Sequence, residues 1–174
     1  YSVYSAIAFV MASGVILTAQ ISTRLLAAPD YFEAWRYVPV LTLATTFACL
    51  GSFLSSIYMV EQRSGATLVT TMLGAAANVA GNILLIPLYG SMGAAFSTLL
   101  SYLLIWGVRA IHTRSILCIQ LKLPNLLLCS LLLGVQCAMM ELNLSLWPLG
   151  SSIIFVLVAA VNAKPLIRAA RRAL

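Results

Sequence analysis

The sequence predicts an all-α protein, a polytopic membrane helical bundle with six transmembrane helices. Three observations support this prediction: 62% of the residues are hydrophobic, only 8% are charged, and the mean hydropathy is +1.03. The apolar residues gather in six long runs, more than the core of an ordinary domain of this length can bury. The runs do not show the alternating segments of about 10 residues that a membrane β-barrel requires.

Each run approaches the length of about 20 apolar residues that a spanning helix needs. In order, the runs are Tyr4–Thr23, Tyr37–Val60, Ala66–Leu88, Ala94–Val108, Leu123–Met140 and Leu146–Ala163. The fourth run is short, but Gly93 and residues 110–111 can extend it. Pro124 falls in the first turn of the fifth run, where its missing N–H costs little.

The ten Lys and Arg residues divide unequally between the two sides that six alternating spans define. Only Arg24 and Arg36 fall on one side. The other eight are Arg63, Arg109, Arg114, Lys122, Lys164, Arg168, Arg171 and Arg172. Cytoplasmic loops are rich in Lys and Arg, so the sequence predicts a multi-pass protein with a cytoplasmic C-terminus. This topology explains the net charge of +6 without a nucleic-acid partner.

Chemically reactive groups are sparse. No Asp, Glu, Lys or Arg falls near the middle of a run, which argues against a proton relay or a voltage sensor within these spans. The cysteines form no C-x-x-C pair, and we interpret them as reduced packing residues. We therefore predict no catalytic residues, no metal site and no cofactor. The cysteines are Cys49, Cys118, Cys129 and Cys137.

Small and polar residues form stripes at helical spacing in the second, third and fourth runs. Two interpretations stay open for them: such a stripe allows close helix packing, or it lines a hydrophilic cavity. Paired asparagines favour more than close contact, because an unpaired amide is costly in hydrocarbon. The residues we expect in a substrate cavity are Asn78, Asn82, Thr71, Thr45 and Ser52.

A hairpin motif of Pro87, Gly90, Gly93 and Ala94 joins the third and fourth runs. The ring of Pro87 is expected to end the third helix, because it leaves the carbonyl of Ile83 without its helical donor. The two glycines then permit a sharp turn and a close start to the next helix. We interpret this motif as structural and do not assign it to ligand binding.

The stretch from Asn78 to Tyr102 reads NVAGNILLIPLYGSMGAAFSTLLSY. It resembles the signature of the polysaccharide-transport branch, the oligosaccharide flippases, of the multidrug/oligosaccharidyl-lipid/polysaccharide exporter superfamily. The family pattern is N-x3-N-x-LLIP-x-YG-x2-GAA-x-ST-x2-SY. Its last residue here is Tyr102, which is the one tyrosine well inside an apolar run. The preceding segment FEAWRYVPVLTLATTF also resembles the family, and the similarity extends from about Leu17 to Ile111.

The resemblance implies the C-terminal lobe of a two-lobed MATE-like transporter. Residues 1–113 would form four helices of this lobe, and residues 114–174 would add two helices and a basic tail. The implied activity is translocation of an undecaprenyl-pyrophosphate glycan across the bacterial cytoplasmic (inner) membrane by alternating access, for surface polysaccharide biosynthesis. The implied partners are the lipid bilayer, the lipid-linked glycan, an N-terminal lobe preceding this chain, and a polymerase of the glycan pathway.

A pyrophosphate group requires cations, and four arginines are expected near membrane boundaries. They are Arg24, Arg36, Arg63 and Arg109. Each can instead determine topology or reach the lipid headgroups. Two other functions stay open: a drug/cation antiporter of the same superfamily, and a membrane glycosyltransferase or polymerase using Asp30 and Glu33.

Overall fold

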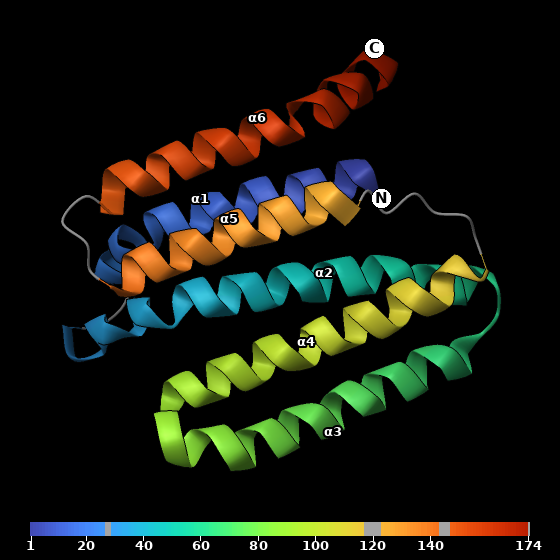
Figure 1. The fold of residues 1–174 in the computed structure, drawn as a ribbon, viewed down its shortest axis with the longest axis horizontal. Coiled ribbons are helices and arrows are strands. Elements are labelled where there is room, and N and C mark those ends of the chain that lie inside the picture. Colours follow the sequence, from blue (N-terminus) through green and yellow to red (C-terminus); the bar gives the residue numbers. More distant parts are fainter. Residues whose placement is uncertain (27–28, 117–122, 143–146, 174) are drawn as a thin grey trace. The chain divides into compact units, whose positions relative to one another are not determined.

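The computed structural model describes residues 1–26, 29–116, 123–142 and 147–173, and it is all-α over these ranges (Figure 1). Cys118 and Lys122 lie outside the described residues, as do the side chains of Asp30, Arg168 and Arg172. Six helices within the described ranges are long and apolar enough to cross a membrane. The predicted all-α class and the six predicted spans are therefore confirmed.

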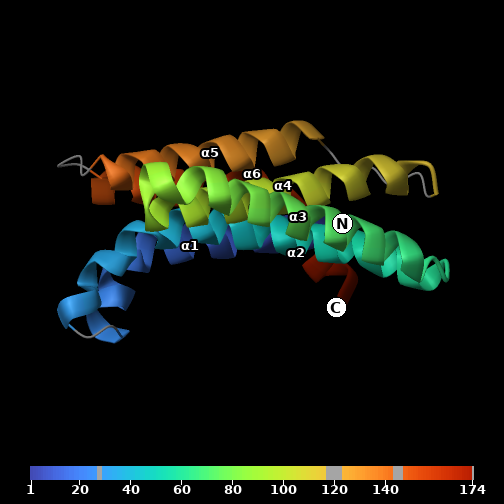
Figure 2. The same ribbon diagram turned by 90° about the horizontal axis from the view of Figure 1, so that it is seen from below.

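Each apolar run of the sequence corresponds to one helix (Figure 2), and a short 3-10 helix, η1, follows α1 and precedes α2 along the chain. The elements are α1 (Ser2–Leu26), η1 (Pro29–Arg36), α2 (Val38–Val60), α3 (Ser64–Tyr89), α4 (Ser91–Arg114), α5 (Leu123–Glu141) and α6 (Trp147–Ala173). The predicted fourth span ran from Ala94 to Val108, with room to extend to residue 111, whereas α4 continues through Arg109 to Arg114.

The chain forms two compact units, and one of them combines segments from both ends of the sequence. Unit 1 comprises Tyr1–Leu43 and Leu121–Leu174, and unit 2 comprises Ala44–Gln120. Unit 1 therefore holds α1, η1, α5 and α6, whereas unit 2 holds α3, α4 and most of α2. The expected division after residue 113 rests on the family resemblance and stays a prediction.

In unit 1, α1 packs against α5 and α6 around a buried polar contact. The Ser13 hydroxyl donates to Gln136 Oε1 at 2.8 Å, and Gln136 Nε2 donates to the Ser13 carbonyl at 3.1 Å. Both residues are fully buried, and Phe9, Ile16 and Leu133, about one turn away along the same helices, are buried too. The reciprocal pairing satisfies two polar groups that would be costly to bury alone.

An ion pair joins η1 to the end of α5, also within unit 1. Arg36 donates to Glu141 Oε1 at 2.8 Å through one terminal nitrogen and at 3.3 Å through Nε. The hydrogen bond and the charge of Glu141 raise the pKa of Arg36 above its usual value. Because both side chains are exposed, the contact contributes little to stability.

In unit 2, α3 and α4 form an antiparallel hairpin that depends on glycine (Figure 1). Gly90, between the two helices, has φ +58°, and its N–H donates to the Ile86 carbonyl at 2.8 Å. A Cβ on Gly93 would collide with the backbone carbonyl of Leu85. Pro87 lies in the last turn of α3, which continues to Tyr89 instead of ending at the proline.

The C-terminal part of α2 lies against α4 in the same unit. The rings of Phe47 and Trp106 meet edge to face with centroids 5.4 Å apart. Near the ends of the two helices, the Tyr58 hydroxyl lies 3.0 Å from His112 Nδ1. The α2–α3 turn and the C-terminal end of α4 therefore lie at the same end of unit 2.

Candidate functional site

The two asparagines singled out by the sequence lie together between α3 and α4. Asn82 Nδ2 donates to Asn78 Oδ1 at 3.1 Å. Asn78 Nδ2 lies 3.4 Å from the hydroxyls of Thr98 and Ser101, which is beyond the usual N–H···O range. Among the described residues, buried Asn82 Oδ1 has no hydrogen-bond partner. This amide pair therefore retains hydrogen-bonding capacity that the protein does not use.

A groove of about 390 Å³ opens beside this pair. We call it the amide groove. Its polar lining comes from hydroxyl and amide side chains, which offer neutral donors and acceptors. The lining residues are Thr71, Gly74, Ala75, Asn78, Thr98, Ser101, Tyr102 and Ile105.

Arg109 is buried in unit 2, with 6% of its surface exposed. Its Nε donates to Thr70 Oγ1, one terminal nitrogen to the Gly51 carbonyl, and the other to Thr71 Oγ1, all at 3.0 Å. The sequence placed Arg109 in a loop after the fourth span. That placement is wrong, because these hydrogen bonds allow the charged residue to lie within α4.

No described carboxylate neutralises Arg109. The one ion pair within the described ranges joins Arg36 to Glu141. Burying a charge without a counter-ion is expensive, and hydrogen bonds to neutral partners offset only part of that cost. Ionisable residues held in this way inside membrane helices commonly mark ligand or ion paths.

A second groove, of about 430 Å³, opens at Arg109. We call it the arginine groove. It shares Thr71, Tyr102 and Ile105 with the amide groove, so the two grooves adjoin. Its other lining residues are Ala48, Ser52, Ser55, Ser56, Met59 and Arg109. The combined surface carries one cation among neutral hydroxyls and amides.

Three of the five predicted cavity residues line these grooves, and a fourth, Asn82, is hydrogen-bonded to one of them. Thr71 lines both, Asn78 lines the amide groove, Ser52 lines the arginine groove, and Asn82 is bonded to Asn78. Thr45 is exposed on α2 but does not line either groove.

Of the four predicted arginines, only Arg109 lines a groove. The guanidinium of Arg24 lies 5.5 Å from the ring centre of Phe32 in unit 1, and Arg36 pairs with Glu141. Arg63 is exposed just before the start of α3.

Sequence reasoning did not select Tyr102, Ser55, Thr70 or Ser101 as site residues. For Tyr102 a signal existed, since it is the one tyrosine well inside an apolar run. Thr70 offered no signal, because its role depends on Arg109, 39 residues away.

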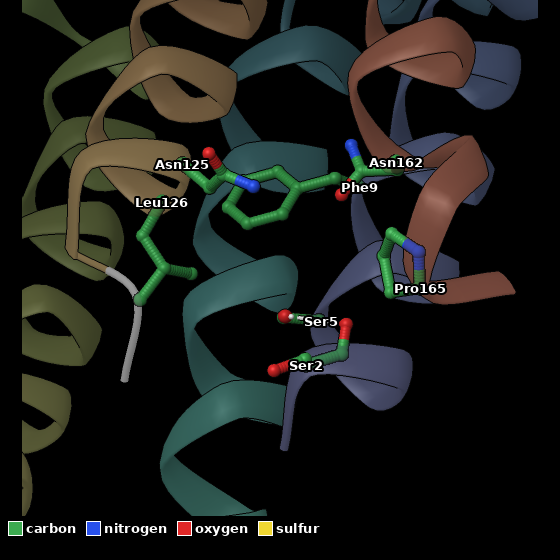
Figure 3. A pocket seen from close by; sticks show the side chains of 7 residues that line it. All are labelled: Ser2, Ser5, Phe9, Asn125, Leu126, Asn162 and Pro165. Carbon is green, nitrogen blue, oxygen red and sulfur yellow. Dashed lines mark hydrogen bonds between the residues drawn. The ribbon is translucent and has the colours of Figure 1, made fainter. Parts of the chain in front are cut away.

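Unit 1 contains a much smaller cavity between α1, α5 and α6 (Figure 3). Its volume of about 20 Å³ suits a single water molecule. Ser2, Ser5, Asn125 and Asn162 supply its polar lining, and Asn162 Nδ2 also donates to the Val158 carbonyl at 2.8 Å. The cavity is too small for an organic substrate.

The six apolar helices define a multi-pass membrane protein. No family model, curated protein or solved structure matches the chain. Within the described ranges, His, Cys, Asp and Glu residues form no cluster able to hold a metal ion. The chemistry available in the grooves is therefore hydrogen bonding and charge attraction by Arg109.

Proposed function

We propose that this chain is part of a transporter that moves a lipid-linked oligosaccharide across the bacterial cytoplasmic membrane by alternating access. The observation that carries the proposal is the pair of adjoining grooves in unit 2, which combine a buried arginine with neutral hydroxyl and amide side chains. The sequence resemblance over Asn78–Tyr102 supports the same function.

The groove chemistry matches the two parts of such a substrate. Sugar hydroxyls exchange hydrogen bonds with neutral groups such as those of Asn78, Thr98 and Ser101. A phosphate needs a cation, and a guanidinium suits it because its planar N–H fork matches the phosphate oxygens. Arg109 is the one cation that lines these grooves.

The proposed topology has the α2–α3 turn, the end of α4 and the C-terminus in the cytoplasm. Its support is the distribution of the Lys and Arg residues other than buried Arg109, because seven of these nine fall on that side. In this orientation the arginine groove lies toward the cytoplasm and the α3–α4 hairpin lies toward the outer face. By the resemblance, a second lobe would face the grooves and alternate with this one.

The rival functions fit the grooves less well. A drug/cation antiporter needs a site that attracts a cation, whereas Arg109 would repel one. A glycosyltransferase or polymerase needs carboxylates at its reaction centre, and among the described residues no Asp or Glu lines either groove.

The proposal can be tested by complementation with the complete gene in a bacterium that lacks its own lipid-linked-oligosaccharide flippase but makes a matching glycan. We expect the wild type to restore surface polysaccharide. Asn78→Ala, Asn82→Ala and Thr71→Ala should each reduce it at normal expression. Thr45→Ala is the matched control, since Thr45 does not line a groove, and it should restore fully.

Two results would contradict the proposal. The first is no restoration by a well-expressed wild-type protein with the matching glycan. The second is restoration that the groove variants leave intact but the Asp30→Ala/Glu33→Ala double variant abolishes, which would indicate the enzyme instead.

A further inference from the structure

The two adjoining grooves differ in charge along the length of α4. Arg109 lies in the arginine groove, whereas Ser101 lies in the amide groove, eight residues earlier in the same helix. At 1.5 Å per residue, this spacing separates the two positions by about 12 Å along the helix. Tyr102 lines both grooves and therefore lies between the charged end and the neutral end.

We propose that the combined groove is a two-part binding site with a fixed polarity. An oxyanion binds beside Arg109, a neutral sugar binds beside Asn78, and Tyr102 separates the two. The oxyanion is a phosphate or the carboxylate of an acidic sugar. This inference rests on the proposed function for its choice of ligands, and it adds the direction in which the polar part of the substrate lies.

The charged end is prepared for an anion. The three hydrogen bonds of Arg109 use three of the five N–H donors of its side chain, and no described residue accepts from the other two. The bonds to Thr70, Thr71 and Gly51 hold the guanidinium in one orientation before a ligand arrives. An incoming anion would also neutralise a charge that the described residues leave without a counter-ion.

The neutral end is prepared for hydroxyl donors. The Thr98 hydroxyl donates to the Ala94 carbonyl at 2.9 Å, and the Ser101 hydroxyl donates to the Thr98 carbonyl at 2.8 Å. Each hydroxyl proton is therefore already used within α4, and the oxygens remain as acceptors. A sugar hydroxyl can donate to them, and its ring can pack on the apolar face of Tyr102.

Protection of single cysteines from a thiol reagent tests this polarity without measuring transport. The complete protein, with its native cysteines replaced by alanine, receives Ser55→Cys in the arginine groove or Ala75→Cys in the amide groove. Ser64→Cys, exposed and outside both grooves, is the matched control. Modification by a water-soluble methanethiosulfonate is timed in membrane vesicles at constant ionic strength.

Inorganic pyrophosphate, glucuronate and the neutral sugar lactose are the probes. At about 10 mM, a probe with a Kd of about 1 mM slows labelling of the cysteine that it covers about tenfold. We expect pyrophosphate or glucuronate to protect Ser55→Cys and lactose to protect Ala75→Cys. Ser64→Cys should react at the same rate throughout. Pyrophosphate protection without glucuronate protection assigns the anion as phosphate, and the reverse assigns it as carboxylate.

Adding Arg109→Gln should abolish the anion protection and retain the lactose protection, which also reports that the variant is folded. Equal protection of both cysteines by every probe would overturn the two-part site. So would anion protection that survives Arg109→Gln, or no labelling at either groove position. Protection that follows the expected pattern while complementation fails would contradict the transport proposal and leave the binding site standing.

Discussion

Replacing Arg109 by methionine should change stability far less than its three hydrogen bonds suggest. Each bond contributes about 1 kcal/mol net, so their loss alone costs about 3 kcal/mol. Methionine also removes the cost of burying a guanidinium without a counter-ion, which is several kcal/mol. Because the two effects oppose each other, we expect Arg109→Met to lower the free energy of unfolding by about 0–2 kcal/mol.

The threonines that accept hydrogen bonds from Arg109 allow a second, contrasting prediction. Thr70 and Thr71 donate their own hydroxyl protons to backbone carbonyls of α3, at 2.9 and 2.8 Å, so each threonine keeps an acceptor for its proton when Arg109 is replaced. Thr70→Val, in contrast, leaves a buried guanidinium N–H without an acceptor. That variant should cost about 1–3 kcal/mol, and the double variant Thr70→Val/Arg109→Met should be no less stable than Thr70→Val alone.

The assay is reversible unfolding of the complete protein in mixed micelles by added dodecyl sulfate, followed by circular dichroism. A loss of about 4 kcal/mol or more for Arg109→Met would refute the reasoning, because it would show a side chain required for folding. The reasoning would also be refuted if the effects of the two single substitutions were additive. A double-mutant cycle would then detect no coupling between Arg109 and Thr70.

Three further predictions concern the rest of the chain. Gly93→Ala should destabilise unit 2 by about 1–3 kcal/mol, because the added Cβ collides with a backbone carbonyl of α3. The measurement is thermal unfolding, and Gly107→Ala is the matched control because a Cβ on Gly107 has no other atom within 4 Å. Cysteines at positions 55 and 67 should form a disulfide on mild oxidation, since the Ser55 and Thr67 hydroxyl oxygens are 3.2 Å apart. A pair that stays reduced would contradict this side-chain contact between α2 and α3. Glu141 in α5 raises the pKa of Arg36, so the contribution of this ion pair to stability is complete below the ordinary arginine pKa and is lost only as pH rises through the higher folded value. The free energies of unfolding of the wild type and Arg36→Gln should therefore follow parallel curves between about pH 6 and 9. Curves that diverge in this range would contradict the prediction.

The six helices were predictable because hydropathy and helical length are local properties of the sequence. Arg109 was misplaced for the same reason: hydropathy treats an arginine as the end of a span, and only the distant Thr70, Thr71 and Gly51 explain its burial. Thr45 was grouped with Ser52 by helical spacing, but the arginine groove reaches only the C-terminal part of α2. A repeating pattern identifies a helix face without showing how far a neighbouring helix covers it.

The division into two packing units could not be predicted from the sequence, because it also depends on contacts between distant residues. Each helix of unit 1 is apolar on most faces, so the sequence does not indicate that α1 packs on α5 and α6. Gln136 lies within an apolar run, but its reciprocal contact with Ser13 joins residues 123 positions apart. The asparagines were easier to locate, because they pair with each other within α3, and the neighbouring Thr98 and Ser101 belong to the next helix of the same hairpin.

The contact between Ser13 and Gln136 has a consequence for biosynthesis. Ser13 emerges from the ribosome before Gln136, which is translated 123 residues later. At about 5–20 residues per second, this interval lasts about 6–25 seconds. During that time α1 must reside in the bilayer, or beside the insertion machinery, without the glutamine that completes its packing. The first helix of this chain to be made is thus among the last to reach its native neighbours.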